Sequence, residues 1–292
     1  MKEILVTGAS GLCGHSCCKL LLEKGYSVYA IVKNRTTELV NGVKPVVMDL
    51  SDEWDESVMP RKVDVILHLA QSPYFREFPE NAVNLFKVNI ESTIRLLDYG
   101  HRVGVKKFIF TSSGGVYGNG RQAFNENFPI VPTGELGHYL GSKACSEIMI
   151  HNYATFFDVI ILRPFFVYGP GQEQSMLIPR LFRSVGRGSP IILQGSSGIC
   201  LNPVHVNDAS RAMVQSCLLE ESAVINIAGP EVLSMKAICD TFGDFLGVEP
   251  IYESSVEPTS NLIGDIELMK SLLHVPSIRL SDSLEEFVLD KT

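Results

Sequence analysis

The chain has 292 residues, of which 45% are hydrophobic, and its formal net charge at pH 7 is −8. This apolar content is enough to bury a sizeable core, so we expect one large domain or two smaller ones. The negative charge offers no general attraction to polyphosphates or anionic membranes, and any phosphate binding must come from a local arrangement of groups. We therefore expect neither nucleic acid nor a membrane as a partner.

The sequence around Met1 and the cysteines bear on location. Met1 is followed by a short strand-like segment, unlike a secretory signal, and no apolar run is long enough to span a bilayer. The seven cysteines lack the paired spacing of a zinc site or a disulfide framework. We expect reduced thiols, no metal site and a cytoplasmic location.

Short β-branched segments alternate with longer amphipathic segments in the first half. Strands are predicted at 3–7, 27–32, 44–48, 63–69, 107–111 and 159–162. Helices are predicted between them, most clearly at 12–24, 81–103 and 139–156. This order is typical of an α/β fold with a doubly wound parallel sheet covered on both faces, the Rossmann arrangement.

A glycine-rich turn joins the first predicted strand to the first predicted helix, with glycines three residues apart. Glycine permits a tight turn and a close approach of backbone to ligand, and the free N–H groups of the helix start then face a pyrophosphate. The order strand, turn and helix predicts a dinucleotide-binding loop. Its predicted cofactor-binding residues are Gly8, Ser10, Gly11, Leu12, Cys13 and Gly14.

The end of the second predicted strand indicates which dinucleotide is bound. Proteins that accept NAD carry an acidic residue there, about twenty residues past the glycines, for the adenosine ribose. Between Glu23 and Glu38 there is no acidic residue, whereas Lys33, Asn34 and Arg35 follow the strand. The missing carboxylate and the two cations favour NADP over NAD.

Turn formers at 164–171 interrupt the alternation of strands and helices. We predict a dinucleotide-binding Rossmann domain at 1–166, to which the chain returns at about 202–230. Residues 167–201 and 231–292 are predicted to form a smaller α/β substrate-binding portion. Further elements are expected as a helix at 176–186, strands at 191–193 and 224–228, a helix starting near 207 and a closing helical region.

Tyr139 and Lys143 lie four residues apart in a predicted helix and therefore share one face. An adjacent ammonium group and a positive nicotinamide ring favour phenolate, so we expect the pKa of Tyr139 to be lowered from about 10. Tyr139 would then act as a general acid and base near neutral pH. Upstream, Ser112 and Ser113 end the fifth predicted strand, where a serine can hydrogen-bond a substrate oxygen as its charge develops.

These motifs resemble the extended short-chain dehydrogenase/reductase family, NAD(P)-dependent epimerases, dehydratases and reductases that modify nucleotide sugars. The resemblance runs over nearly the whole chain, in the family's order. It rests on Gly8-x-x-Gly11-x-x-Gly14, Asp49-Leu50, His68-Leu69-Ala70, Asn89, Ser112-Ser113, Tyr139-x-x-x-Lys143, Arg163-Pro164, Tyr168-Gly169-Pro170-Gly171 and His205-Val206-Asn207-Asp208.

The resemblance implies catalytic roles. Ser113 would polarise the substrate oxygen, Tyr139 would transfer the proton, and Lys143 would hold the nicotinamide ribose and tune Tyr139. Asn89 would brace the sheet, and the helices at 81–103 and 139–156 would pair in a homodimer. The further cofactor contacts that it implies are Asp49, Leu50, Leu69, Ala70, Gln71, Thr111, Pro164 and Val167.

The resemblance weakens at the substrate. Nucleotide-sugar enzymes of this family commonly have asparagine at the position of Phe166, arginine at that of Leu201 and a second arginine near Asn261. The chain lacks these groups, which are the ordinary means of pairing a substrate diphosphate. Arg180 is a candidate for the missing charge, and a solvated helical face is an equally good reading. The candidate substrate contacts are Ser112, Ser113, Phe165, Phe166 and Arg180.

The leading hypothesis is an NAD(P)-dependent epimerase or oxidoreductase that acts on a sugar-like substrate. The favoured substrate class is a nucleotide sugar. The reaction is hydride transfer with Tyr139 as general acid and base. Dehydration is less favoured, because Gly114 and Gly115 stand where family dehydratases carry an acidic pair. The alternatives are an NADPH-dependent reductase of small aldehydes or ketones and, from another class, a non-catalytic NADP-binding sensor or scaffold.

Overall fold

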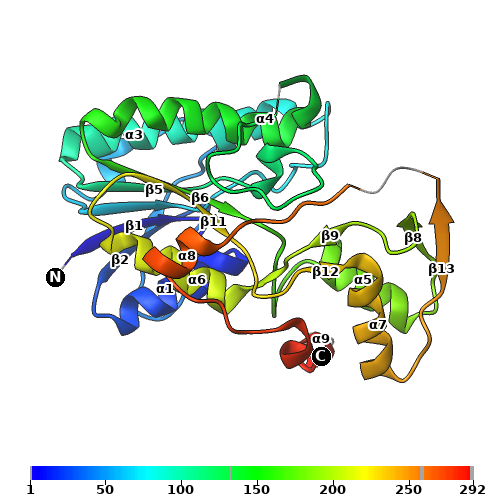
Figure 1. The fold of residues 1–292 in the computed structure, drawn as a ribbon. Helices are drawn as coiled ribbons and strands as arrows, with labels where there is room; N and C mark the ends of the chain where they lie inside the picture. The colour runs from blue at the N-terminus through cyan, green and yellow to red at the C-terminus, as the bar shows by residue number, and fades with distance from the viewer. Residues whose placement is uncertain (1, 132, 257–259, 290–292) are drawn as a thin grey trace.

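The alternating segments of the first half build one parallel sheet (Figure 1). The computed structural model describes residues 2–131, 133–256 and 260–289. The strand order is β11-β6-β5-β4-β1-β2-β3, so strands are added first on one side of β1 and then on the other, and the crevice at the carboxyl edge lies between β1 and β4. The predicted doubly wound fold is confirmed. The strands are β1 (Glu3–Thr7), β2 (Ser27–Val32), β3 (Lys44–Val47), β4 (Val65–His68), β5 (Lys107–Thr111), β6 (Asp158–Pro164) and β11 (Ala223–Ile227).

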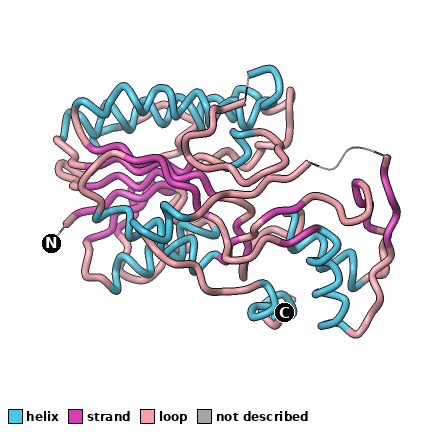
Figure 2. Tube along the Cα trace, in the orientation of Figure 1, coloured by secondary structure: helices cyan, strands magenta, loops and turns pink. Residues whose placement is uncertain are grey.

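Helices cover both faces of this sheet, and Figure 2 shows the strands between two helical layers. On one face α1 (Leu12–Glu23) packs against α6 (Val206–Gln215), and on the other α3 (Ser92–Val103) packs against α4 (Thr133–His151). Successive side chains of a strand point to opposite faces. Accordingly Ile4 and Val6 belong to the core beneath α1 and α6, whereas Leu5 belongs to the core beneath α3 and α4.

The two long helices differ from their predicted bounds. The segment predicted as one helix over 81–103 consists of α2 (Ala82–Phe86), a π-helical turn (Lys87–Glu91) and α3. The helix predicted at 139 begins earlier, at Thr133, contains the non-helical Gly137 (φ 66°, ψ 179°) and is followed by a 3₁₀ turn (Asn152–Thr155). A left-handed φ suits glycine, which therefore bends α4 just before Tyr139.

The second half forms a smaller lobe beside the carboxyl edge, to the right of the sheet in Figure 1. Its core includes Phe182 and Phe242, whose rings meet edge to face. Its helices are α5 (Leu177–Gly186), α7 (Met235–Leu246) and α9 (Glu286–Leu289). Its strand pairs are β8 (Ile191–Gln194) with β13 (Tyr252–Ser255), and β9 (Cys200–Leu201) with β12 (Leu233–Ser234).

Between these strand pairs the chain returns to the sheet. β7 (Val167–Tyr168) pairs with β10 (Val204–His205), α6 packs on α1, and β11 adds the outermost strand beside β6. Later, α8 (Glu267–Leu272) packs beside β11. Within the described residues, no helix is both long enough and apolar enough to cross a bilayer.

Candidate active site

The glycine turn between β1 and α1 is packed too tightly for side chains. Gly8 has φ +69°, and Gly11 donates its N–H to the Gly8 carbonyl at 3.0 Å. A Cβ at Gly14 would lie 2.0 Å from the Gly8 oxygen, and a Cβ at Gly8 would lie 2.8 Å from the Ala70 nitrogen. Glycine is therefore required at both positions.

The start of α1 offers free donors. The helix has no side-chain cap at Gly11 and no acidic residue in its first turn. Its first N–H groups thus lack a partner within the helix and suit an anion, so the turn fits the pyrophosphate of a dinucleotide. A cavity of about 390 Å³ adjoins this turn, and Ser10, Gly11 and Leu12 are among its lining residues.

The ends of β2 and β3 hold the residues that were expected to choose the dinucleotide. Lys33 is exposed, and its Nζ lies 2.9 Å from Asp49 Oδ2. Partial burial opposes ionisation of Asp49, but hydrogen bonds from Ser51 and Lys33 lower the pKa of its carboxyl. Arg35 is exposed, and Asn34 accepts hydrogen bonds from two neighbouring threonines. The segment between Glu23 and Glu38 has no carboxylate of its own, but β3 pairs with β2 and brings the Asp49 carboxylate beside Lys33.

Tyr139 and Lys143 lie on α4 beside the ends of β4 and β5. Lys143 is buried and donates from Nζ to the Thr111 carbonyl at 2.8 Å. Burial lowers the pKa of Lys143 to about 7, against the attraction of Glu147. Tyr139 is half-buried and donates its O–H to Gln71 Oε1 at 3.0 Å.

The Tyr139 pKa is not lowered in the chain without a dinucleotide, and the expected lowering, which depends on the nicotinamide ring as well as on Lys143, stays a prediction. Burial raises the pKa of Tyr139 to about 12. Lys143 directs its ammonium group to the Thr111 carbonyl, and burial disfavours the charged forms of both side chains.

The end of β5 provides three hydroxyl groups. Ser113 Oγ accepts a hydrogen bond from the Gly115 N–H at 3.2 Å and caps the 3₁₀ turn Gly114–Tyr117. Among the described residues, the buried Thr111 Oγ1 and Ser112 Oγ have no hydrogen-bond partner. Unpartnered buried hydroxyls are costly, so this edge suits a polar ligand.

A buried charge network that sequence reasoning missed joins α4 to the Ser113 turn. The Arg163 guanidinium contacts both oxygens of Glu147, at 3.1 and 2.6 Å, and donates to the Tyr117 hydroxyl at 2.7 Å. Glu147 lies four residues beyond Lys143, and this helical spacing was the available signal. The network fixes α4 relative to Ser113.

Asn89 joins the neighbouring elements at the π-helical turn. Its side chain accepts from the Ser72 N–H at 2.8 Å and donates to Ser142 Oγ at 2.9 Å. Its carbonyl accepts from Ser146 Oγ. These bonds tie the loop after β4 to α4, in line with the bracing role that the family resemblance implies.

The candidate substrate residues differ in how far they are exposed. Phe165 is 1% exposed, and a Cβ at Gly114 would lie 2.5 Å from its ring, so Phe165 is part of the core and is not a surface for substrate. Phe166 is partly exposed and has a φ of +46°, a conformation that asparagine tolerates better than phenylalanine. Arg180 is exposed on α5.

The sheet brings the remaining predicted residues to one edge. Leu50 follows β3, Leu69 and Ala70 follow β4, and Pro164 and Val167 lie at the end of β6 and in β7. Within the described residues, no group of three or more side chains of the metal-binding types gathers. A parallel sheet with a glycine turn after its first strand and serine, tyrosine and lysine at its carboxyl edge defines an enzyme that works with a bound dinucleotide.

The comparisons with known proteins identify the family. A sequence model of the NAD dependent epimerase/dehydratase family matches residues 4–228, and the chain belongs to this family. The chain is 29% identical to an uncharacterised UDP-glucose epimerase of Bacillus subtilis, over 97% of this chain and 95% of that protein. It is also 29% identical to a provisionally named UDP-glucose 4-epimerase of Methanocaldococcus jannaschii, over 98% and 97% of the two chains.

A solved structure is similar over the whole length. The UDP-glucuronic acid 4-epimerase of Bacillus cereus, in complex with UDP-glucuronic acid and NAD, superposes with a TM-score of 0.86 at 28% identity. The similarity covers 99% of each chain. The chain is therefore an NAD(P)-dependent enzyme of the epimerase kind.

Proposed function

We propose that the protein is a nucleotide-sugar epimerase in which Ser113, Tyr139 and Lys143 carry the reaction. The observation that carries this proposal is the position of Tyr139 and Lys143 beside the β5 hydroxyls, at the same sheet edge as the glycine turn. Similarity to UDP-sugar epimerases over nearly the whole chain supports a nucleotide-sugar substrate.

In this mechanism Tyr139 takes the proton of the reacting sugar hydroxyl and later returns it. Ser113 donates a hydrogen bond to the same oxygen, and Lys143, anchored on the Thr111 carbonyl, holds the nicotinamide ribose. The bound dinucleotide supplies the hydride-accepting ring and a positive charge that lowers the Tyr139 pKa. Thr111 Oγ1 and Ser112 Oγ gain partners when the edge is occupied.

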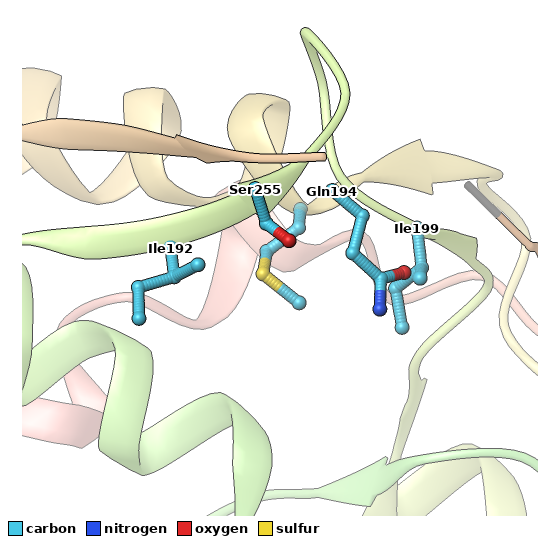
Figure 3. A pocket seen from close by; sticks show the side chains of 5 residues that line it. Ile192, Gln194, Ile199 and Ser255 are labelled. Carbon is cyan, nitrogen blue, oxygen red and sulfur yellow. The ribbon is translucent and has the colours of Figure 1, made fainter. Parts of the chain in front are cut away.

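We propose that the nucleoside of the substrate occupies the smaller lobe. A cavity of about 210 Å³ there is lined by Ile192, Gln194, Ile199, Met235 and Ser255 (Figure 3). Apolar side chains with a few polar groups are the usual lining of a small-molecule site. In this proposal the nucleoside lies in the lobe beside the carboxyl edge, and the sugar is directed to Tyr139.

The test is calorimetric titration of cofactor-stripped protein with dinucleotide, followed by a panel of UDP-, GDP-, CDP- and dTDP-sugars added to the loaded enzyme. We expect one nucleotide sugar to bind and to be converted to its epimer. Tyr139→Phe should bind both ligands and lose conversion by about 100- to 10,000-fold. Dinucleotide binding without any nucleotide-sugar binding would contradict the proposal.

We propose NADP over NAD, on the exposed Arg35 beside the end of β2. Lys33 is already paired with Asp49, and the similar solved structure holds NAD, so the preference depends on Arg35. Arg35→Ala should weaken NADPH binding by about tenfold and leave NADH binding unchanged, since only NADPH carries the 2′-phosphate. Lys24→Ala, at the far end of α1, is the matched control. Equal effects on both dinucleotides would refute the preference.

One observation favours a second candidate, an NADPH-dependent reductase of small aldehydes or ketones. Leu201 is fully buried, and Asn261 accepts the Cys200 N–H, so neither position offers a charge for a diphosphate. Oxidation of NADPH by free carbonyl compounds, without any nucleotide requirement, would support this reading.

We also propose a division of the chain, an assembly and a location. The dinucleotide-binding unit would comprise residues 1–166 and the return at about 202–230. The substrate-binding unit would comprise residues 167–201 and 231–292. Residues 1, 132, 257–259 and 290–292 of these ranges lie outside the described residues.

Four exposed apolar side chains on α2 and α4 support a homodimer: Val83, Phe86, Ile148 and Met149. Light scattering of the variant Ile148→Glu tests this assembly. The unpaired cysteines support a cytoplasmic location.

A further inference from the structure

The three positions at which the family commonly recognises a diphosphate are occupied by other contacts in this chain. Leu201 is fully buried and faces Leu262 and Leu233 in strand pairing. The Asn261 side chain accepts the Cys200 N–H at 3.0 Å. Phe166 packs against the apolar side chains of both lobes. A diphosphate bound in the crevice therefore needs a cation from elsewhere.

Arg76 lies in the segment between β4 and α2 and reaches the smaller lobe. Its Nη1 donates to the Ser175 carbonyl at 3.1 Å, and its Nη2 contacts Met176 Sδ at 3.6 Å. Ser175 and Met176 directly precede α5. A guanidinium group carried by the Rossmann part of the chain thus lies against the edge of the substrate lobe.

Two aromatic contacts connect Arg76 to the catalytic centre. Its guanidinium carbon lies 5.0 Å from the centroid of the Phe75 ring, and the Phe75 ring lies 5.2 Å from the Tyr139 ring. Stacking on Phe75 restricts the planar guanidinium and lowers the entropy lost when it binds a ligand. The charge is therefore held near the place where the reacting sugar must lie, without touching Tyr139.

The partners of Arg76 are neutral. They are a carbonyl, a thioether and an aromatic ring, and no carboxylate pairs with Arg76 within the described residues. Arg163, by contrast, is buried and already bound to Glu147 and to the Tyr117 hydroxyl. Arg95 and Arg102, both on α3, are paired with the carboxylates of Glu91 and Glu56. A phosphate oxyanion adds the attraction of opposite charges and accepts two N–H groups side by side, so it displaces the carbonyl and the thioether.

We propose that Arg76 is the specificity-determining residue that pairs with the diphosphate of the substrate, in place of the arginines that this chain lacks. The inference rests on the proposed nucleotide-sugar function. Arg76 binds the phosphate oxygens with two N–H groups and leaves the Ser175 carbonyl and Met176. The bound diphosphate then connects the two lobes at the place where the Arg76–Ser175 contact connects them in the free protein.

The test is calorimetric titration of the dinucleotide-loaded protein with UDP and with uridine. Arg76→Gln should weaken UDP binding by about 10- to 100-fold and leave uridine binding unchanged, because only UDP carries the diphosphate. The UDP affinity of Arg76→Lys should lie between those of the wild type and Arg76→Gln, since one ammonium group cannot form the bidentate contact. Arg187→Gln, at the other end of α5, is the control and should match the wild type. Dinucleotide affinity should be equal in all four proteins.

Four outcomes would overturn the proposal. UDP binding that is equal in the wild type and Arg76→Gln refutes it and leaves the proposed function standing. A loss seen in Arg180→Gln and not in Arg76→Gln assigns the diphosphate to Arg180. A loss in Arg76→Gln confined to UDP-glucuronic acid, and absent with UDP and UDP-glucose, assigns Arg76 to a sugar carboxylate. A wild type that binds the dinucleotide and no UDP refutes both this proposal and the nucleotide-sugar function.

Discussion

Replacing Gly14 by alanine tests the glycine turn directly. The added Cβ would lie 2.0 Å from the Gly8 oxygen, 2.7 Å from the Gly8 carbonyl carbon and 2.8 Å from the Ala9 Cα. All three atoms belong to the backbone, so α1 must move away from β1 by roughly 1 Å or more, since carbon atoms pack at about 3.5–4.0 Å. Overpacking of this kind costs about 1–3 kcal/mol of unfolding free energy. The N–H groups of the α1 start move with the helix, and we expect dinucleotide affinity to fall at least tenfold.

Two other glycines provide a graded control. At Gly11 an added Cβ would meet the Gly8 oxygen at 3.3 Å, which requires a shift of a few tenths of an ångström. At Gly141, within α4, it would meet nothing within 4 Å, and alanine there should stabilise by about 0.5–1 kcal/mol. Urea unfolding and NADPH calorimetry should rank stability as Gly141→Ala, wild type, Gly11→Ala and Gly14→Ala. Wild-type stability and affinity in Gly14→Ala would refute the reasoning.

Two further predictions concern buried ionisable groups. Glu147→Gln should lower the unfolding free energy by about 3–5 kcal/mol in urea unfolding, because Arg163 is left buried without its carboxylate. The control is Glu91→Gln in the half-exposed Glu91–Arg95 pair, which should cost less than about 1 kcal/mol. Equal losses in the two variants would contradict the argument. Burial lowers the pKa of His68 to about 3 in the fold, against 6.5 in the unfolded chain. Between these values the unfolded state binds more protons, so stability is full above pH 6.5 and falls as pH decreases towards 3. The difference between the urea midpoints of the wild type and His68→Asn should therefore be smaller at pH 5 than at pH 7. An equal difference at both pH values would refute the lowered pKa of His68.

Features that depend on residues close together in the chain could be predicted from the sequence. Alternating β-branched segments specified the parallel sheet, since strands buried on both faces read as continuous apolar runs. The three-residue glycine spacing specified the turn, and the four-residue spacing of Tyr139 and Lys143 specified a shared helical face. These predictions needed no knowledge of which strands are paired.

Features that depend on strand pairing and burial could be read from the folded chain alone. Parallel pairing of β2 and β3 places Asp49 beside Lys33, two side chains that are separate in sequence. Burial sets the pKa of Tyr139 at about 12 and that of Lys143 at about 7, in opposite directions because burial disfavours each charged form. Arg76 meets Ser175 across 99 residues of chain, a contact that exists only because the smaller lobe folds back over the carboxyl edge of the sheet.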